Sequence, residues 1–257
     1  MKIYGVQLNI VWENKRANFE RVKALLHAAS PEPGSIVLLP EMFATGFSMD
    51  VKSIREAVGG KTEKFVSRLA REFQVYLTAG LVQAASRLGH NQSVTFSPEG
   101  AEVVRYSKLQ TFTPGGESAN YEAGRAVVTW NWNGLIVSPF VCYDLRFPEH
   151  FRTAARAGVE LITVIANWPV ARIQHWVTLL QARAIENQCF VAGVNRCGTD
   201  PKLTYNGRSL IVSPKGEILA DAGNGECVIS ADLDVKLLRT YRKDLPFLKD
   251  MKPMSAS

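Results

Sequence analysis

Short apolar runs alternate along this chain with amphipathic segments of helical period, and this alternation constrains the fold more than any other feature. In residues 17–29, Phe19, Val22 and Leu26 share one face at helical spacing, and an apolar run typical of a buried strand follows in residues 35–40. The same succession recurs in the second half of the chain. Strand–helix–strand crossovers favour parallel neighbours, and by themselves they predict one doubly wound sheet.

Two stretches break this pattern because each is typical of an antiparallel hairpin. Residues 92–108 turn around Pro98, and residues 126–144 turn at Asn133 and Gly134. Hairpins force antiparallel pairing beside the parallel pairs of the crossovers. The sequence therefore predicts an α/β domain with mixed sheets.

The overall composition is that of an ordinary globular chain. Its 257 residues are 46% hydrophobic, and no linker or repeat divides them, so we expect one domain over residues 1–257 with a tail or arm in residues 249–257. The formal charge of +6 is scattered, which argues against a nucleic-acid partner. Gln7 and Asn9 interrupt the apolar N-terminus, and no stretch approaches the roughly 18 apolar residues of a spanning helix. We therefore expect a cytoplasmic protein without a membrane partner.

Side chains of complementary chemistry follow three of the predicted strands. Glu41 follows the run ending at Pro40, Lys108 follows the hairpin strand containing Tyr106, and Cys142 follows the run 135–141. Ligands of open α/β sheets bind beyond the carboxyl ends of the strands. A thiolate attacks a carbonyl carbon, a carboxylate carries the proton, and an ammonium stabilises the oxyanion. The three residue types together indicate nucleophilic catalysis.

Taken singly, most of these residues have a structural interpretation as well. Cys142 alone is more commonly a small buried hydrophobe, Lys108 a surface lysine and Glu117 an ordinary loop acid. Glu41 is harder to explain structurally, because a carboxylate directly after an apolar strand needs a partner or an opening to solvent. The histidines and cysteines lack metal-site spacing, and no dinucleotide-binding, Walker or G-x-S-x-G motif appears, so we expect neither a metal nor a cofactor.

Three separated segments together resemble the nitrilase superfamily of carbon–nitrogen hydrolases: LLPEMFATGF around Glu41, YSKLQTF around Lys108 and VCYDLRFPE around Cys142. The family's catalytic glutamate, lysine and cysteine fall on these positions, and a second family glutamate falls on Glu117 in GGESANYEAG. The resemblance implies a four-layer α-β-β-α sandwich and a homodimer or larger homo-oligomer. It also implies a thioester on Cys142, with the oxyanion held by Lys108 and the backbone N–H of Tyr143.

The segment ANWPVARIQHW, taken with VCYDLRFP, is similar to the omega-amidase branch of this family. That similarity implies hydrolysis of a small amide such as 2-oxoglutaramate or 2-oxosuccinamate to the acid and ammonia. The carboxylate of such a substrate calls for a cation, and the candidates are Arg146, Arg172 and Arg196. Arg146 equally suits a bracing role in an ion pair with Asp144 or Glu149.

The walls of the substrate pocket are less well defined by the sequence. The candidates are three aromatic residues, with core packing as the alternative for each: Phe43, Tyr143 and Trp168. Relatives commonly have His-Leu where this chain has Gln110 and Thr111, and the following loop also differs. We expect these departures to affect substrate preference more than chemistry.

Other reactions on the same residues remain open. The same nucleophile serves other amidases of the superfamily, N-carbamoyl amino-acid hydrolases and true nitrilases, and the pocket decides among them. A catalytically inactive scaffold or binding protein is a further alternative. The intact set of Glu41, Lys108 and Cys142 argues against that alternative.

Overall fold

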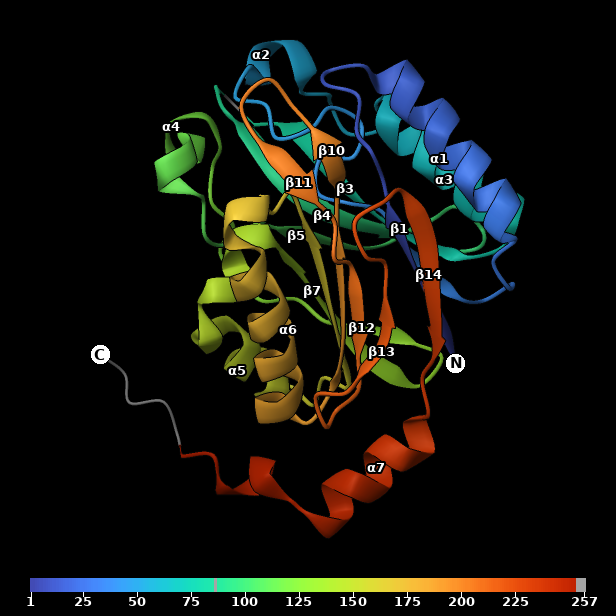
Figure 1. Cartoon of the computed structure of the whole chain (residues 1–257), viewed down its shortest axis with the longest axis vertical. Coiled ribbons are helices and arrows are strands. Elements are labelled where there is room, and N and C mark those ends of the chain that lie inside the picture. Colours follow the sequence, from blue (N-terminus) through green and yellow to red (C-terminus); the bar gives the residue numbers. More distant parts are fainter. Residues whose placement is uncertain (86, 253–257) are drawn as a thin grey trace.

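Two six-stranded mixed sheets form the centre of the computed structural model, which describes residues 1–85 and 87–252 (Figure 1). In the first sheet β1, β2 and β3 are parallel, and the other strands pair antiparallel at its two edges. The strand order of the first sheet is β14 (Cys227–Asp232), β1 (Lys2–Gln7), β2 (Ile36–Leu38), β3 (Tyr76–Ala84), β4 (Gly89–Phe96) and β5 (Glu102–Ser107).

The second sheet repeats this plan, with three parallel strands at its centre and antiparallel strands outside. Its strand order is β13 (Ile218–Asp221), β12 (Leu210–Val212), β9 (Phe190–Asn195), β8 (Leu161–Ala166), β7 (Leu135–Val141) and β6 (Trp130–Trp132). A separate small hairpin, β10 (Cys197–Thr199) with β11 (Thr204–Asn206), was not predicted.

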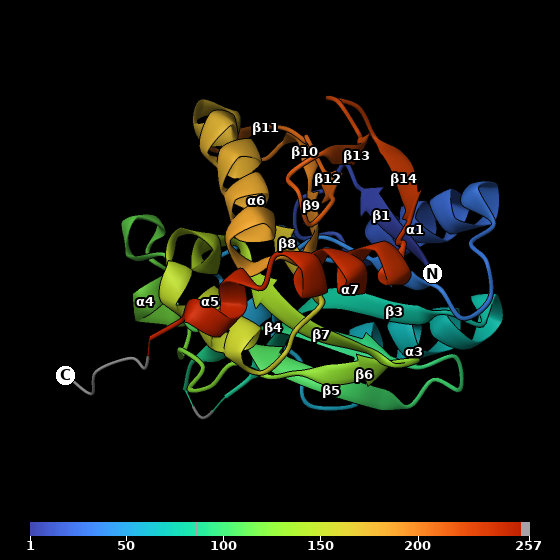
Figure 2. The ribbon, with the colours of Figure 1, turned by 90° about the horizontal axis from the view of Figure 1, so that it is seen from below.

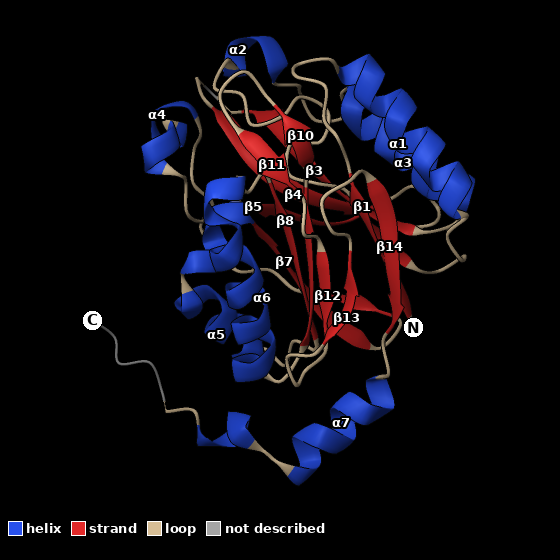
Figure 3. Ribbon diagram, viewed as in Figure 1, coloured by secondary structure: helices blue, strands red, loops and turns tan. Residues whose placement is uncertain are grey.

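Helices cover the outer face of each sheet (Figure 3). On the first sheet these are α1 (Lys15–Ala29) and α3 (Lys61–Phe73), and on the second α5 (Pro148–Arg156) and α6 (Ile173–Asn187). The two pairs lie on opposite sides of the sheets in both views (Figures 1 and 2). The remaining helical elements are α2 (Val51–Ile54), η1 (Thr113–Gly115), α4 (Glu117–Asn120), η2 (Cys142–Arg146), η3 (Val170–Arg172), α7 (Val235–Asp244) and η4 (Phe247–Asp250).

Alternation along the strands explains the four layers. In β2 and the residue after it, Ile36 and Leu38 pack against the second sheet, whereas Val37 and Leu39 pack toward the helices. Each strand is therefore buried on both faces, as a continuous apolar run indicates. The predicted α-β-β-α sandwich with mixed sheets is confirmed, and the single doubly wound sheet is wrong. A second sheet and a helix layer bury a strand equally well, so the apolar pattern does not tell them apart.

The two predicted hairpins are confirmed as β4–β5 and β6–β7. Asn133 and Gly134 both have positive φ, as the tight turn between twisted strands requires. Within residues 1–85 and 87–252, no helix is long and apolar enough to cross a membrane. Of the residues predicted as a tail, Lys249 and Asp250 belong to η4, and residues 253–257 lie outside the described part of the chain.

Candidate active site

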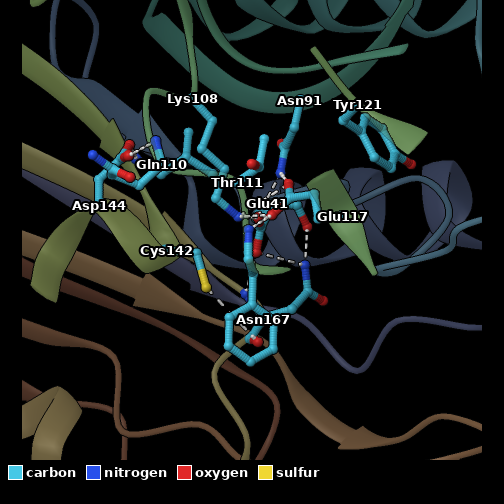
Figure 4. Close-up of polar contacts among 12 residues, drawn as sticks. Glu41, Asn91, Lys108, Gln110, Thr111, Glu117, Tyr121, Cys142, Asp144 and Asn167 are labelled. Carbon is cyan, nitrogen blue, oxygen red and sulfur yellow. Dashed lines mark hydrogen bonds and ion pairs between the residues drawn. The ribbon is translucent and has the colours of Figure 1, made fainter. Parts of the chain in front are cut away.

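Polar side chains that follow strands of both sheets come together in one cluster (Figure 4). Glu41 and Lys108 follow β2 and β5 of the first sheet, while Cys142 and Asn167 follow β7 and β8 of the second. The carboxyl ends of parallel strands meet at the same edge, which is why these distant segments come together. The three residues predicted to form the catalytic set are thus neighbours in the structure.

Lys108 lies between two carboxylates and is fully buried with them. Its Nζ donates to Glu41 Oε1 at 2.9 Å and to the two oxygens of Glu117 at 3.1 and 2.8 Å. Burial alone would lower the pKa of Lys108, but the charges of Glu117 and Glu41 raise it well above its usual range. The lysine is therefore an ammonium at any physiological pH.

Asn91 joins the same two carboxylates from β4. Its Nδ2 donates to Glu41 Oε1 at 2.7 Å and to Glu117 Oε1 at 2.8 Å, and its backbone oxygen accepts from the Lys108 amide. Sequence reasoning missed this residue, because an asparagine in a polar stretch of strand carries no signal of burial. Its alignment with the lysine strand across the β4–β5 hairpin is what brings it to the site.

The second carboxylate oxygen of Glu41 faces the second sheet. Glu41 Oε2 accepts from the backbone N of Asn167 at 2.8 Å, and Asn167 Nδ2 donates to the Glu41 carbonyl at 2.7 Å. Burial would raise the pKa of Glu41, but the Lys108 charge and the bonds from Lys108, Asn91 and Asn167 lower it. Glu41 is held ionised by neighbours on both sheets.

Two glycines allow the backbone to approach these residues closely. A Cβ on Gly80 of β3 would lie 2.4 Å from the Glu41 Cα, and one on Gly124 would lie 2.1 Å from the Ser107 oxygen. Gly124 also donates its N–H to the carbonyl of Lys108 at 2.8 Å. The loop that carries Glu117 therefore returns at Gly124, seven residues later, to pack against Ser107 and Lys108.

Cys142 begins the turn η2 with a φ of 46°, in the left-handed region that residues other than glycine seldom adopt. Its partly exposed thiol reaches the pocket, and Sγ lies 4.0 Å from the carbonyl oxygen of Asn167. Burial and the charge of Glu41 raise the pKa of the thiol well above its usual range, although Lys108 lowers it. The resting nucleophile is therefore a thiol beside an ionised carboxylate.

A pocket of about 440 Å³ opens in front of Cys142. Glu41, Lys108 and Glu117 are not among its lining residues, so the charged cluster lies behind the thiol. Four of the predicted substrate-binding residues line it, and with them come others that were not predicted. The predicted ones are Tyr143, Arg146, Trp168 and Arg172, and the additional ones include Trp12, Phe47, Phe112, Asn167, Lys202, Leu203 and Tyr205.

The two arginines of the pocket lie over aromatic rings. The Arg146 guanidinium is 4.7 Å from the centre of the Trp168 ring, and that of Arg172 is 5.6 Å from Phe112. Among the described residues, neither arginine forms an ion pair with a carboxylate. Arg146 instead lies 3.3 Å from Nδ1 of His175, so the alternative in which it pairs with Asp144 or Glu149 is not found.

Two predicted binding residues lie elsewhere. Phe43 is fully buried and packs near Phe19 and Phe65 in the core between the first sheet and its helices, so its assignment to the pocket is wrong. Arg196 is also fully buried, and it donates to the backbone oxygens of Ile10 and Thr199 instead of reaching the pocket. Both side chains follow a strand end but turn into the interior.

Gln110 and Thr111, where the chain departs from the family pattern, do not line the pocket. The side-chain amide of Gln110 lies 3.2 Å from His150 Nε2. Thr111 Oγ1 lies 2.9 Å from the hydroxyl of Ser118, next to Glu117. Of this segment, Phe112 lines the pocket, whereas Gln110 and Thr111 make contacts outside it.

The comparisons with known proteins identify the family of this chain. The carbon–nitrogen hydrolase family model matches residues 5–243. The chain is 37% identical to the omega-amidase YafV of Yersinia enterocolitica over 97% of this chain and 96% of that one. It is 29% identical to a 2-oxoglutaramate amidase of Bacillus subtilis over 96% of each.

A solved structure gives the same result. XC1258 of Xanthomonas campestris, a CN-hydrolase superfamily protein with an arsenic adduct in its active site, matches with a TM-score of 0.94 and 31% identity over 100% of this chain and 99% of that one. The chain belongs to the carbon–nitrogen hydrolase family. It is an enzyme of the nitrilase superfamily, and the resemblance inferred from its three motifs is confirmed.

Proposed function

We propose that this enzyme hydrolyses the terminal amide of a short 2-oxo acid, such as 2-oxoglutaramate or 2-oxosuccinamate, and releases ammonia. The observation that carries the proposal is the pair Arg146 and Arg172, two cations in the pocket of Cys142 that contact aromatic rings and His175 and form no ion pair with a carboxylate of the described residues. A substrate carboxylate supplies the missing partner, as bidentate arginine recognition favours. The names of the relatives, omega-amidase and 2-oxoglutaramate amidase, support the same substrate class.

Acylation begins when Cys142 Sγ attacks the amide carbon. A C–S bond forms, the thiol proton passes to Glu41, and the carbonyl electron pair moves onto oxygen. The Lys108 ammonium and the N–H of Tyr143, which lies in the first turn of η2, stabilise this oxyanion. Glu41 then gives the proton to the nitrogen, the C–N bond breaks, and ammonia leaves a thioester on Cys142.

Hydrolysis of the thioester reverses these roles. Water adds to the thioester carbon as Glu41 takes its proton, and the C–S bond breaks when the oxyanion collapses. The departing sulfur takes the proton back from Glu41, which restores the resting site. Glu117 holds Lys108 in place during both steps and is assigned to the catalytic set for that reason.

The proton positions of the resting site fit this sequence. The pKa of Glu41 is lowered and that of Cys142 is raised, so the proton rests on sulfur. Transfer becomes favourable only when negative charge moves to the substrate oxygen beside Lys108. Interactions that strengthen in the transition state are the ones that accelerate the reaction.

The proposal extends to one catalytic domain over residues 1–257 and to a homodimer or larger homo-oligomer in the cytoplasm. Exposed apolar side chains near the ends of α6 and α7 support an association surface: Ile185, Leu237, Leu245 and Phe247. Sedimentation equilibrium at several protein concentrations tests this part, and a monomer at every concentration contradicts it.

The substrate is tested by steady-state ammonia release from 2-oxoglutaramate, beside glutamine, an N-carbamoyl amino acid and a simple nitrile. We expect strong preference for 2-oxoglutaramate and no turnover by Cys142→Ala, which keeps the fold. Preference for another compound of the panel refutes the substrate and keeps the chemistry. Full activity of Cys142→Ala refutes the chemistry itself.

A further inference from the structure

Asp144 connects the two sheets at the active site, and the reaction described above assigns it no role. It lies in η2, two residues after Cys142, and is fully buried. Figure 4 shows it beside Gln110, on the opposite side of the site from Glu117. A buried carboxylate is costly unless donors or charges compensate it.

Three donors converge on the Asp144 carboxylate. The hydroxyl of Tyr106 donates to Oδ2 at 2.7 Å, the backbone N of Val141 donates to Oδ2 at 2.9 Å, and the backbone N of Gln110 donates to Oδ1 at 2.8 Å. Tyr106 and Gln110 lie two residues before and two residues after Lys108. Val141 precedes Cys142 directly.

These contacts fix one catalytic segment against the other. Lys108 follows β5 of the first sheet and Cys142 follows β7 of the second. The distance between them therefore depends on how the two sheets are held together. Through Tyr106 and Gln110, the Asp144 carboxylate binds the chain on both sides of Lys108. Tyr106 is itself held, because its ring packs edge-on against Phe140 of β7 at 5.7 Å.

We propose that Asp144 is a positioning residue whose ionised carboxylate aligns the Lys108 ammonium with the Cys142 thiol. The inference rests on the proposed function, since it concerns the same reaction site. Loss of the charge leaves the backbone N–H groups of Val141 and Gln110 facing a poorer acceptor. Misplacement of catalytic groups by about 1 Å is sufficient to cost on the order of 10²-fold in rate.

Several titratable groups lie around Asp144, and its own charge changes with pH. They are Tyr106 and Lys108, in and directly after β5, and His150 on α5, whose ring lies 3.2 Å from the side chain of Gln110. Burial raises the pKa of Asp144 to about 6, against the opposing effect of Tyr106, Val141, Lys108 and Gln110. The carboxylate is therefore half ionised near pH 6, and the alignment is lost as the pH falls through that value.

The test compares four variants by the pH profile of kcat, measured on whichever amide of the panel turns over. We expect Asp144→Asn to lower kcat about 100-fold and to lack the acid limb near pH 6. We expect Tyr106→Phe to lower kcat several-fold and to move that limb to higher pH, since it removes a bond that lowers the pKa of Asp144. Tyr4→Phe, a buried tyrosine far from the site, is the matched control.

The variant His150→Gln tests whether Asp144 or His150 produces the acid limb of the pH profile. It should keep the limb near pH 6, and its disappearance in this variant overturns the assignment to Asp144. Wild-type kcat in Asp144→Asn also overturns it. If Asp144→Asn fails to fold, Tyr106→Phe decides: an unmoved limb refutes the proposal. Labelling of Cys142 by iodoacetamide needs no substrate, and it should be slower in Asp144→Asn and in Tyr106→Phe than in the wild type. Unchanged labelling in these two variants counts against the alignment even if no amide of the panel is hydrolysed.

Discussion

The Nζ atom of Lys108 lies 2.9 Å from Oε1 of Glu41, and both side chains are fully buried. Glu117 contacts the same ammonium at 2.8 Å, so one cation compensates two carboxylates. Such a cluster can stabilise charge in the transition state. It also makes the fold sensitive to mutation, because each buried charge is compensated by the others. The first prediction follows from this dependence.

Replacing Lys108 by Met should remove both activity and stability. The oxyanion loses its ammonium, which typically costs about 10² to 10³ in rate. Breaking a buried ion pair leaves uncompensated charge and destabilises by about 3–5 kcal/mol. Ammonia release and urea unfolding measure the two effects, with Lys64→Met on the exposed face of α3 as control. A variant as stable as that control contradicts the buried-cluster account.

The reactivity of Cys142 should depend on pH and on the charge behind it. Burial, Glu41 and Glu117 raise the pKa of the thiol and Lys108 lowers it, so the thiolate fraction is small at neutral pH and grows as the pH rises. Alkylation by iodoacetamide should therefore accelerate through the alkaline range. At about pH 7.5, Glu117→Gln should label faster than wild type and Lys108→Met more slowly. Mass spectrometry of the labelled peptide gives the rates, and the reverse order of the two variants refutes this charge balance.

Asn91→Leu should lower kcat by about 10- to 100-fold while leaving a folded protein. Its amide donates to both Glu41 and Glu117, and hydrogen bonds to charged groups contribute about 1.5–3 kcal/mol each. Without it, the two carboxylates lose the neutral donor that they share. Ser93→Ala is the matched control, because its buried hydroxyl on the same strand has no partner in the described part of the chain. Equal kinetics for the two variants would falsify the role of Asn91.

The sequence predicted the residues whose chemistry is unusual for their position, and it missed those whose chemistry is ordinary. Glu41 after an apolar strand, and a lysine and a cysteine at other strand ends, are recognisable because burial of such groups needs a reason. Asn91 and Asn167 are not, since an asparagine is equally common on a surface strand or in a loop. Their importance comes only from which strands lie next to each other.

The sequence also did not show in which direction a side chain near a strand end points. Phe43 comes two residues after Glu41, but the chain leaves β2 in a tight turn and the ring points into the core. The doubly wound sheet was wrong for a related reason: local pattern reports that a strand is buried and not what buries it. Pairing between distant strands, which decides both matters, is a property of the whole chain.

The last prediction concerns Arg146 and Arg172, which meet in the pocket as like charges. Burial and the charge of Arg172 lower the pKa of Arg146, and a substrate carboxylate would relieve this repulsion between the two guanidinium groups. Arg146→Gln should lower kcat/KM for 2-oxoglutaramate about 10²- to 10³-fold, because truncating one partner of a desolvated charge pair costs 2–5 kcal/mol. Turnover of a neutral amide such as propionamide should change little, since it has no charge to lose.

The comparison of the two substrates in one variant separates binding from chemistry. Arg172→Gln should show the same selectivity with a smaller loss, because its guanidinium lies farther from its aromatic ring than that of Arg146 and is less constrained. Arg68→Gln on the exposed face of α3 controls for the change of net charge. If both amides lose activity equally in Arg146→Gln, the arginine supports the cysteine turn and does not read the carboxylate. Retained preference for 2-oxoglutaramate in the double variant would place the carboxylate site elsewhere, with Lys202, a further cation of the pocket wall, as the next candidate.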